Sequence, residues 1–340
     1  MAGGAVEVRF GSKIENTNDT KAKGASEDIE IKAKSLLLDA RNPSNPESKR
    51  GRARIAAGTN SKPGGNAGSI DIRVGSLRMI GFKTDKGANS GDGISSNTSG
   101  NGNAGKITIM VEGDFIMTDR AQIGARSNSR SAKGDANDII IEAGSLFLSK
   151  RSFITSQVRS NSKGNPGNIT ITAKDKIEIT NSDIKTVVSD NAGNPESAKK
   201  NPGGVGNITI TAHSLSLKDG KLEALNQGKI PASDITVNAT DFVKISGLKR
   251  LSGIFTETKL GTQGVRDNKS QGGRIEITTG KLTVSNDSFV STRGIGGVPG
   301  GDIIIEAKEV EVTQGGQILA NALNTNALNT IPFEVVELVD

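Results

Sequence analysis

Two acidic residues, Glu30 and Asp71, are the candidates for acid–base chemistry in this 340-residue chain. Each lies between two isoleucines spaced two apart, and in a strand such a residue points to the face opposite them. If the two segments lie side by side, the carboxylates become neighbours, as they are in many enzymes that cleave polysaccharides. Exposed acids on strands are far more common than active sites, so a polysaccharide lyase or hydrolase is kept as an alternative only.

A basic run is the candidate for binding a polyanion such as a phosphate or a sulfated sugar; it contains Lys49, Arg50, Arg52 and Arg54. The simpler interpretation is a solvated surface loop, because short basic runs are weak signals. The formal net charge of +6 is spread through many such loops. The chain has no Tyr and no Trp to stack on bases, so we expect no nucleic-acid partner.

Other catalytic or metal-binding constellations are not predicted. His213 is the only histidine, and we expect it at a corner between two strands. The chain has no cysteine, which excludes disulfides and thiolate metal sites. Residues 100–106 resemble the start of a phosphate-binding loop, but Ile107 follows where Ser or Thr is required. We therefore predict no catalytic residue, no metal and no cofactor.

The elements that would position these residues repeat nine times along the chain. Each repeat starts with two aliphatic residues spaced two apart, which predicts a strand with one apolar face. These pairs are Ile29/Ile31, Ile70/Ile72, Ile107/Ile109, Ile139/Ile141, Ile169/Ile171, Ile208/Ile210, Ile235/Val237, Ile275/Ile277 and Ile303/Ile305. A second apolar pair follows seven or eight residues later, and a third strand is anchored by one apolar residue such as Ile55 or Ile94.

This pattern predicts an all-β fold with almost no helix, a single-stranded right-handed parallel β-helix of about nine coils with three short strands each. We expect an incomplete first coil over residues 1–27, the repeats over residues 28–320, and a tail or cap over residues 321–340. Clusters of Gly, Asn and Pro, such as residues 66–68 and 203–206, would supply sharp turns, where glycine adopts positive φ angles at little cost.

Connections between strands differ in length. Longer ones fall at residues 39–54, 80–93, 185–206, 246–253 and 255–273. Insertions in repeat proteins often map to a binding face. They also occur as neutral drift, because closing a longer surface loop costs little, and both interpretations stay open here.

Three segments carry a resemblance to a known family: residues 167–173 (GNITITA), residues 206–212 (GNITITA) and residues 214–217 (SLSL). They resemble the repeats of filamentous-haemagglutinin-like, two-partner-secretion exoproteins of the cyanobacterial type. The resemblance covers the repeat region only, about residues 28–320. It implies a right-handed β-helix exported through an outer-membrane transporter partner, which acts in adhesion or other contacts at the cell surface.

These observations favour a non-enzymatic, secreted or surface-exposed adhesin-like rod whose loops contact cell-surface glycans or other cells. The alternatives are the polysaccharide-cleaving enzyme above and an inert structural spacer of a larger exoprotein. No apolar run is long enough to span a membrane as a helix, and the first thirty residues do not resemble a signal peptide.

Overall fold

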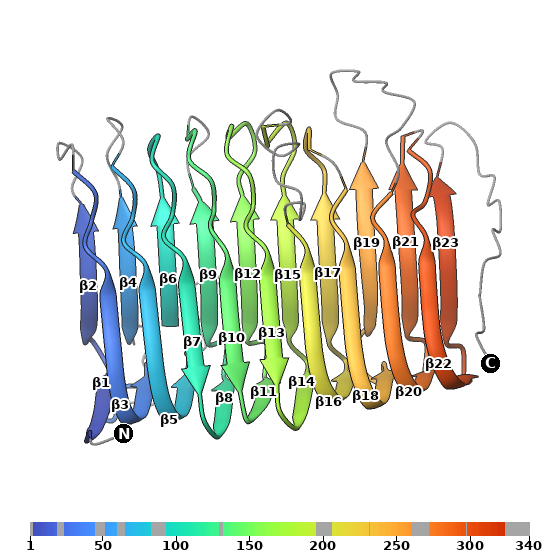
Figure 1. The fold of residues 1–340 in the computed structure, drawn as a ribbon, viewed down its shortest axis with the longest axis horizontal. Coiled ribbons are helices and arrows are strands. Elements are labelled where there is room, and N and C mark those ends of the chain that lie inside the picture. The colour runs from blue at the N-terminus through green and yellow to red at the C-terminus, as the bar shows by residue number, and fades with distance from the viewer. Residues whose placement is uncertain are drawn as a thin grey trace.

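The computed structural model describes residues 3–18, 24–44, 52–59, 65–82, 93–128, 132–194, 206–230, 232–259, 272–296 and 298–323. These residues form 23 strands and no helix, which confirms the all-β prediction. The strands build two sheets in which every pairing is parallel, and the sheets face each other as two layers (Figure 1). The chain advances along the long axis of the molecule, from blue to red in Figure 1.

The larger sheet has 13 strands and the smaller sheet has ten. The larger sheet contains β1 (Ala5–Arg9), β3 (Ile29–Asp39), β5 (Ile70–Ile80), β7 (Ile107–Val111), β8 (Asp114–Thr118), β10 (Ile139–Ala143), β11 (Ser145–Ser149), β13 (Ile169–Ala173), β14 (Lys176–Thr180), β16 (Ile208–Lys218), β18 (Ile235–Ser246), β20 (Ile275–Ser285) and β22 (Ile303–Val312). The smaller sheet contains β2 (Lys13–Asn18), β4 (Arg54–Thr59), β6 (Gly93–Thr98), β9 (Gln122–Ser127), β12 (Phe153–Val158), β15 (Asp183–Val188), β17 (Lys221–Asn226), β19 (Gly253–Lys259), β21 (Phe289–Ile295) and β23 (Gln317–Leu323).

The prediction of a single-stranded right-handed β-helix with three short strands per coil is wrong. Eight strands of the larger sheet form a closed parallel ring, β5–β7–β10–β13–β16–β14–β11–β8, and the smaller sheet lies beside it. The ring closes because β5 and β16 are long strands. Residues 70–74 of β5 pair with β7 and residues 77–80 pair with β8, while the two halves of β16 pair with β13 and β14. In β5 and in β16, two segments that the sequence predicts as separate strands therefore form one continuous strand.

The apolar columns predicted from the repeat form the core between the sheets. Ile29 pairs in register with Ile70, Ile70 with Ile107, and the same column continues to Ile303. Nearly all these side chains are fully buried, because alternate residues of a strand point to opposite faces. The second apolar pair and the single residue of the third strand add parallel columns, and Phe115 is the largest fully buried side chain. The boundaries at residues 27 and 321 stay a prediction.

Glycines at the turns serve two purposes. Gly206 has a φ of +78°, which confirms the prediction for that residue, whereas a second set of glycines is required for close backbone packing. Gly24, Gly65, Gly102, Gly134 and Gly164 form a column in which φ is not positive. A Cβ atom on Gly65 would lie 1.8 Å from the carbonyl oxygen of Gly24, and one on Gly134 would lie 1.8 Å from that of Gly102. The glycines are therefore required because successive turns stack with their backbones in close contact.

Asparagine and aspartate side chains also connect successive turns. In one column, Oδ1 of each residue accepts the backbone N–H of its counterpart in the next repeat, at 2.7–2.9 Å: Asn66, Asn103, Asp135, Asn165 and Asn194. A second column joins Asn168, Asn207 and Asp234 in the same way. Each bond satisfies a turn N–H that no sheet partner reaches.

Replacing Asp135 with asparagine is expected to stabilise the protein at pH 7 by roughly 0.5 kcal/mol. Burial raises the pKa of Asp135, and the Asn165 N–H offsets this only in part. A raised pKa means that the folded state binds the proton more tightly, so this aspartate makes the fold less stable as the pH rises. Asparagine keeps the acceptor without the charge. Urea denaturation at pH 7 and at pH 3 measures the gain, which should vanish at the lower pH.

Asn165→Asp, at the next position of the column, is the matched control and should destabilise at pH 7. Equal stability of Asp135→Asn and the parent protein at pH 7 would contradict the prediction.

Candidate functional site

The basic run lies only partly in the region that the structure describes. Lys49 and Arg50 fall outside the described residues, and Arg52 is exposed. Arg54, at the start of β4, forms an ion pair through Nη2 with Oε1 of Glu15 on β2. Polyanion binding by these four residues stays a prediction, and one of them already has a carboxylate partner.

Glu30 and Asp71 are neighbours, because they face each other in the register of β3 and β5. Each one is bound to a cation on its own strand. Lys32 Nζ lies 2.5 Å from Glu30 Oε1, and Arg73 donates to both oxygens of Asp71 at 2.9 and 3.1 Å. Polysaccharide cleavage requires two carboxylates in different environments, one acting as acid and the other as base or nucleophile. Here both carboxylates have the same kind of environment.

His213 lies where β16 bends and its register with β18 shifts. Its Nδ1 is 2.9 Å from Thr240 Oγ1, and its Nε2 is 3.8 Å from Asp241 Oδ2. The side chain is 55% exposed. His213 therefore joins two neighbouring strands at the corner where the sequence places it.

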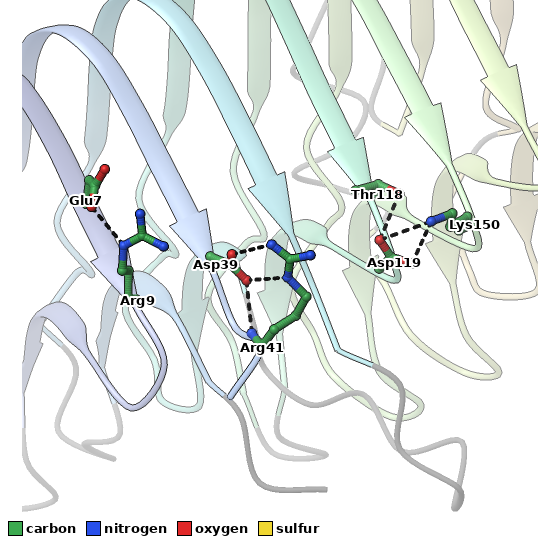
Figure 2. A network of polar contacts seen from close by, with 7 residues as sticks. All are labelled: Glu7, Arg9, Asp39, Arg41, Thr118, Asp119 and Lys150. Atoms are coloured by element: carbon green, nitrogen blue, oxygen red, sulfur yellow. Dashed lines mark hydrogen bonds and ion pairs between the residues drawn. The ribbon is translucent and has the colours of Figure 1, made fainter. Parts of the chain in front are cut away.

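Charged side chains near the ends of several strands of the larger sheet form ion pairs with one another (Figure 2). Arg41 donates to both oxygens of Asp39 at 2.9 and 2.6 Å, and Lys150 lies 3.2 Å from Asp119. Burial alone would raise the pKa of Asp39, but the bonds from Arg41 hold this pKa below its ordinary value. These two ion pairs leave their own carboxylates little free to bind a cationic ligand.

A groove lies on the outer face of the larger sheet. It has a volume of about 670 Å³ and crosses β16, β18, β20 and β22. Its floor is a row of outward residues in register: Ser216, Lys244, Thr283 and Glu311. Lys218, Ser246, Ser285 and Thr313 form the next row. The inward neighbours of these residues are the core side chains, so the strand alternation places the polar row outside.

The loop 247–252 borders the groove, and a single carboxylate fixes it. Asp219 Oδ1 accepts the backbone N–H groups of Leu248, Lys249 and Arg250 at 2.7, 2.7 and 3.0 Å. Burial would raise the pKa of Asp219, but these three donors hold it below its ordinary value. The loop therefore has a defined shape, in which the side chains of Leu248 and Leu251 are 61% and 58% exposed.

Charge in the groove changes from one end to the other. Lys281 on β20 binds Glu309 and Glu311 of β22 at 2.6 and 3.1 Å, so its own charge is compensated and one negative charge is left over at the end of the groove over β22. Lys218 and Lys244, at the end over β16 and β18, form no ion pair with a described residue. The groove thus offers two free ammonium groups and several hydroxyl groups, a set suited to a carboxylated, hydroxyl-rich ligand.

Sequence reasoning missed the groove lysines, because they become neighbours only through the strand register. The sequence did indicate one part of the groove: the longer connection at residues 246–253 forms its wall.

In the described residues, no group of three or more His, Asp or Glu could hold a metal ion. The same residues include no helix of the length and apolarity needed to cross a membrane. No protein-family model matches this chain, and neither a curated protein nor a solved structure matches it.

Proposed function

We propose that this chain is a non-enzymatic, adhesin-like protein that contacts acidic glycans through the groove on the outer face of the larger sheet. The observation that carries the proposal is a pair of lysines, Lys218 and Lys244, which form no ion pair within the described part of the chain and lie beside a loop of fixed shape. Ammonium groups attract carboxylates, and the serine and threonine hydroxyls of the floor can bind sugar hydroxyls. A preformed site loses little conformational entropy on binding.

The repeat resemblance supports a secreted or cell-surface location and export with an outer-membrane transporter partner. Contact with the glycans of another cell fits that location. The alternative of a polysaccharide-cleaving enzyme is weaker, because its two carboxylates are engaged with Lys32 and Arg73.

Adherence of the purified chain to surfaces coated with alginate, a carboxylated polysaccharide, tests the proposal. The double variant Lys218→Gln, Lys244→Gln is expected to bind at least tenfold more weakly, because hydrogen bonds to charged groups contribute about 1.5–3 kcal/mol each. The parent protein and its variants should all adhere only weakly to neutral dextran, which has no carboxylates.

The matched control is Lys34→Gln, Lys106→Gln, which removes the same charge from exposed positions outside the groove. This control should change binding less than twofold, since separated surface charges are screened by salt. Equal losses in both double variants, or adherence no stronger than that of an inert protein of similar charge, would refute the proposal.

A further inference from the structure

Arg126, on the outer face of the smaller sheet, is a mostly buried cation that has no carboxylate partner among the described residues. Burial lowers the pKa of Arg126, and the nearby charge of Arg159 lowers it further. The guanidinium makes one hydrogen bond to a described residue, from Nη2 to Gln122 Oε1 at 3.2 Å. Buried charges in proteins are normally paired, so this side chain calls for an explanation.

The local sequence places the guanidinium flat against the sheet. Gly124 is the outward residue before Arg126 on β9, and a Cβ atom there would lie 3.0 Å from Arg126 Cζ. The missing side chain therefore leaves room for the guanidinium. Cζ also lies 5.9 Å from the centre of the Phe153 ring on β12.

Two further groups lie around Phe153. Lys185 on β15 holds its Nζ 5.8 Å from the centre of the same Phe153 ring. Thr155 lies between Gly124 and Lys185 in the register of β9, β12 and β15. Thr155 is 2% exposed, and its Oγ1 has no hydrogen-bond partner. A hydroxyl donor without a partner thus lies on β12, between the two strands that carry these cations.

The acids nearest in register each have another cation as partner, although the second oxygen of Asp183, Oδ1, is buried without a hydrogen-bond partner in the described part of the chain. Asp183 Oδ2 accepts from Arg250 at 2.8 Å, and Glu223 lies 3.3 Å from Lys221. Among the described residues, neither Arg126 nor Lys185 forms an ion pair with a carboxylate. An external anion is therefore the partner that the cluster lacks.

We propose that Arg126, Lys185 and Thr155 form a binding site for a sulfate group, either free or as an ester on a polysaccharide. The guanidinium keeps four N–H donors beyond its bond to Gln122, and its planar fork fits two oxygens of one oxyanion. The ammonium of Lys185 and the hydroxyl of Thr155 supply donors from the other side. The Phe153 ring excludes water from one edge, which strengthens the charge interactions. This site lies on the sheet opposite the groove, so it is independent of the proposed function.

Calorimetric titration of the full chain with dextran sulfate tests this site, with neutral dextran as the reference. Arg126→Gln is expected to lower the affinity at least tenfold. Arg78→Gln is the matched control, because it removes the same charge from an exposed position on the larger sheet, and it should change the affinity less than twofold. The variant Lys218→Gln, Lys244→Gln should keep most of the affinity for dextran sulfate.

Thr155→Val is the second variant, because it keeps the side-chain shape and removes only the unpartnered hydroxyl. It should fold normally and bind dextran sulfate about threefold more weakly. Sodium sulfate is then tested as a competitor of dextran sulfate, with sodium chloride at equal ionic strength as the reference. Stronger competition by sodium sulfate indicates a site that binds the sulfate ion itself, and equal competition indicates a site that needs the polymer. Undiminished binding by Thr155→Val, or equal losses in Arg126→Gln and Arg78→Gln, would overturn the inference.

Discussion

Replacing Gly134 with alanine is expected to destabilise the protein by about 3 kcal/mol or more. The new Cβ atom would lie 1.8 Å from the carbonyl oxygen of Gly102 and 2.4 Å from its carbonyl carbon. Both atoms belong to the backbone of the preceding turn, so no side chain can move aside to relieve the contact. The two turns must separate, which disturbs the hydrogen bonds on either side. The midpoint of urea denaturation measures the effect.

Gly24→Ala is the matched control in the same glycine column. Gly24 lies at the start of the column, and a Cβ atom there meets nothing within 4 Å. Its substitution should change the stability by less than about 0.5 kcal/mol. If both variants lose the same stability, the effect comes from the flexibility of glycine and the stacking explanation is wrong.

Replacing Phe115 with alanine should destabilise the protein by about 3–5 kcal/mol. Phe115 is 0% exposed and lies in register between Leu77 of β5 and Leu146 of β11. Its removal leaves a cavity that neighbouring columns cannot fill, because their side chains are fixed by the strand register. Urea denaturation followed by circular dichroism measures the loss.

Phe147 provides the comparison, because it lies on the neighbouring strand β11 and points to the outer face. Its ring contacts Lys176, whose Nζ lies 5.3 Å from the ring centre. Phe147→Ala should destabilise by less than about 1 kcal/mol. A similar loss at both positions would show that the core does not lie where the structure places it.

The apolar columns could be predicted from the sequence because their signal is local. Two aliphatic residues spaced two apart, as in Ile169/Ile171 and Ile208/Ile210, define the buried face of a strand without any knowledge of its partner. The structure pairs these residues in register. A repeat of one such pattern favours parallel neighbours, and the prediction of an all-β protein followed directly.

The strand boundaries could not be predicted in the same way. Between the two apolar pairs, β16 remains extended through His213, whereas β13 ends at Ala173 and β14 begins at Lys176. Both connecting segments are short and polar. Hydrogen bonds to the adjacent strands decide which of the two segments stays extended as part of one strand. The closed ring of eight strands depends on this difference, so the predicted fold was wrong at that level.

The candidate sites show the same limit. Lys218, Lys244, Arg126 and Lys185 occupy outward positions that the alternation indicates. Their lack of carboxylate partners depends on which strands become neighbours and on where Asp183 and Glu223 point. The alternation therefore indicates the face of the sheet on which these side chains lie, but not their burial or the charge around them.

Parallel pairing throughout both sheets also determines how the protein would respond to mechanical force. The strands lie across the long axis, so the hydrogen bonds between neighbouring strands run along it (Figure 1). Tension applied at the two ends would load these bonds one row after another and peel strands from an end. The molecule would lengthen in successive small steps, and would absorb a pull gradually before the whole structure is lost.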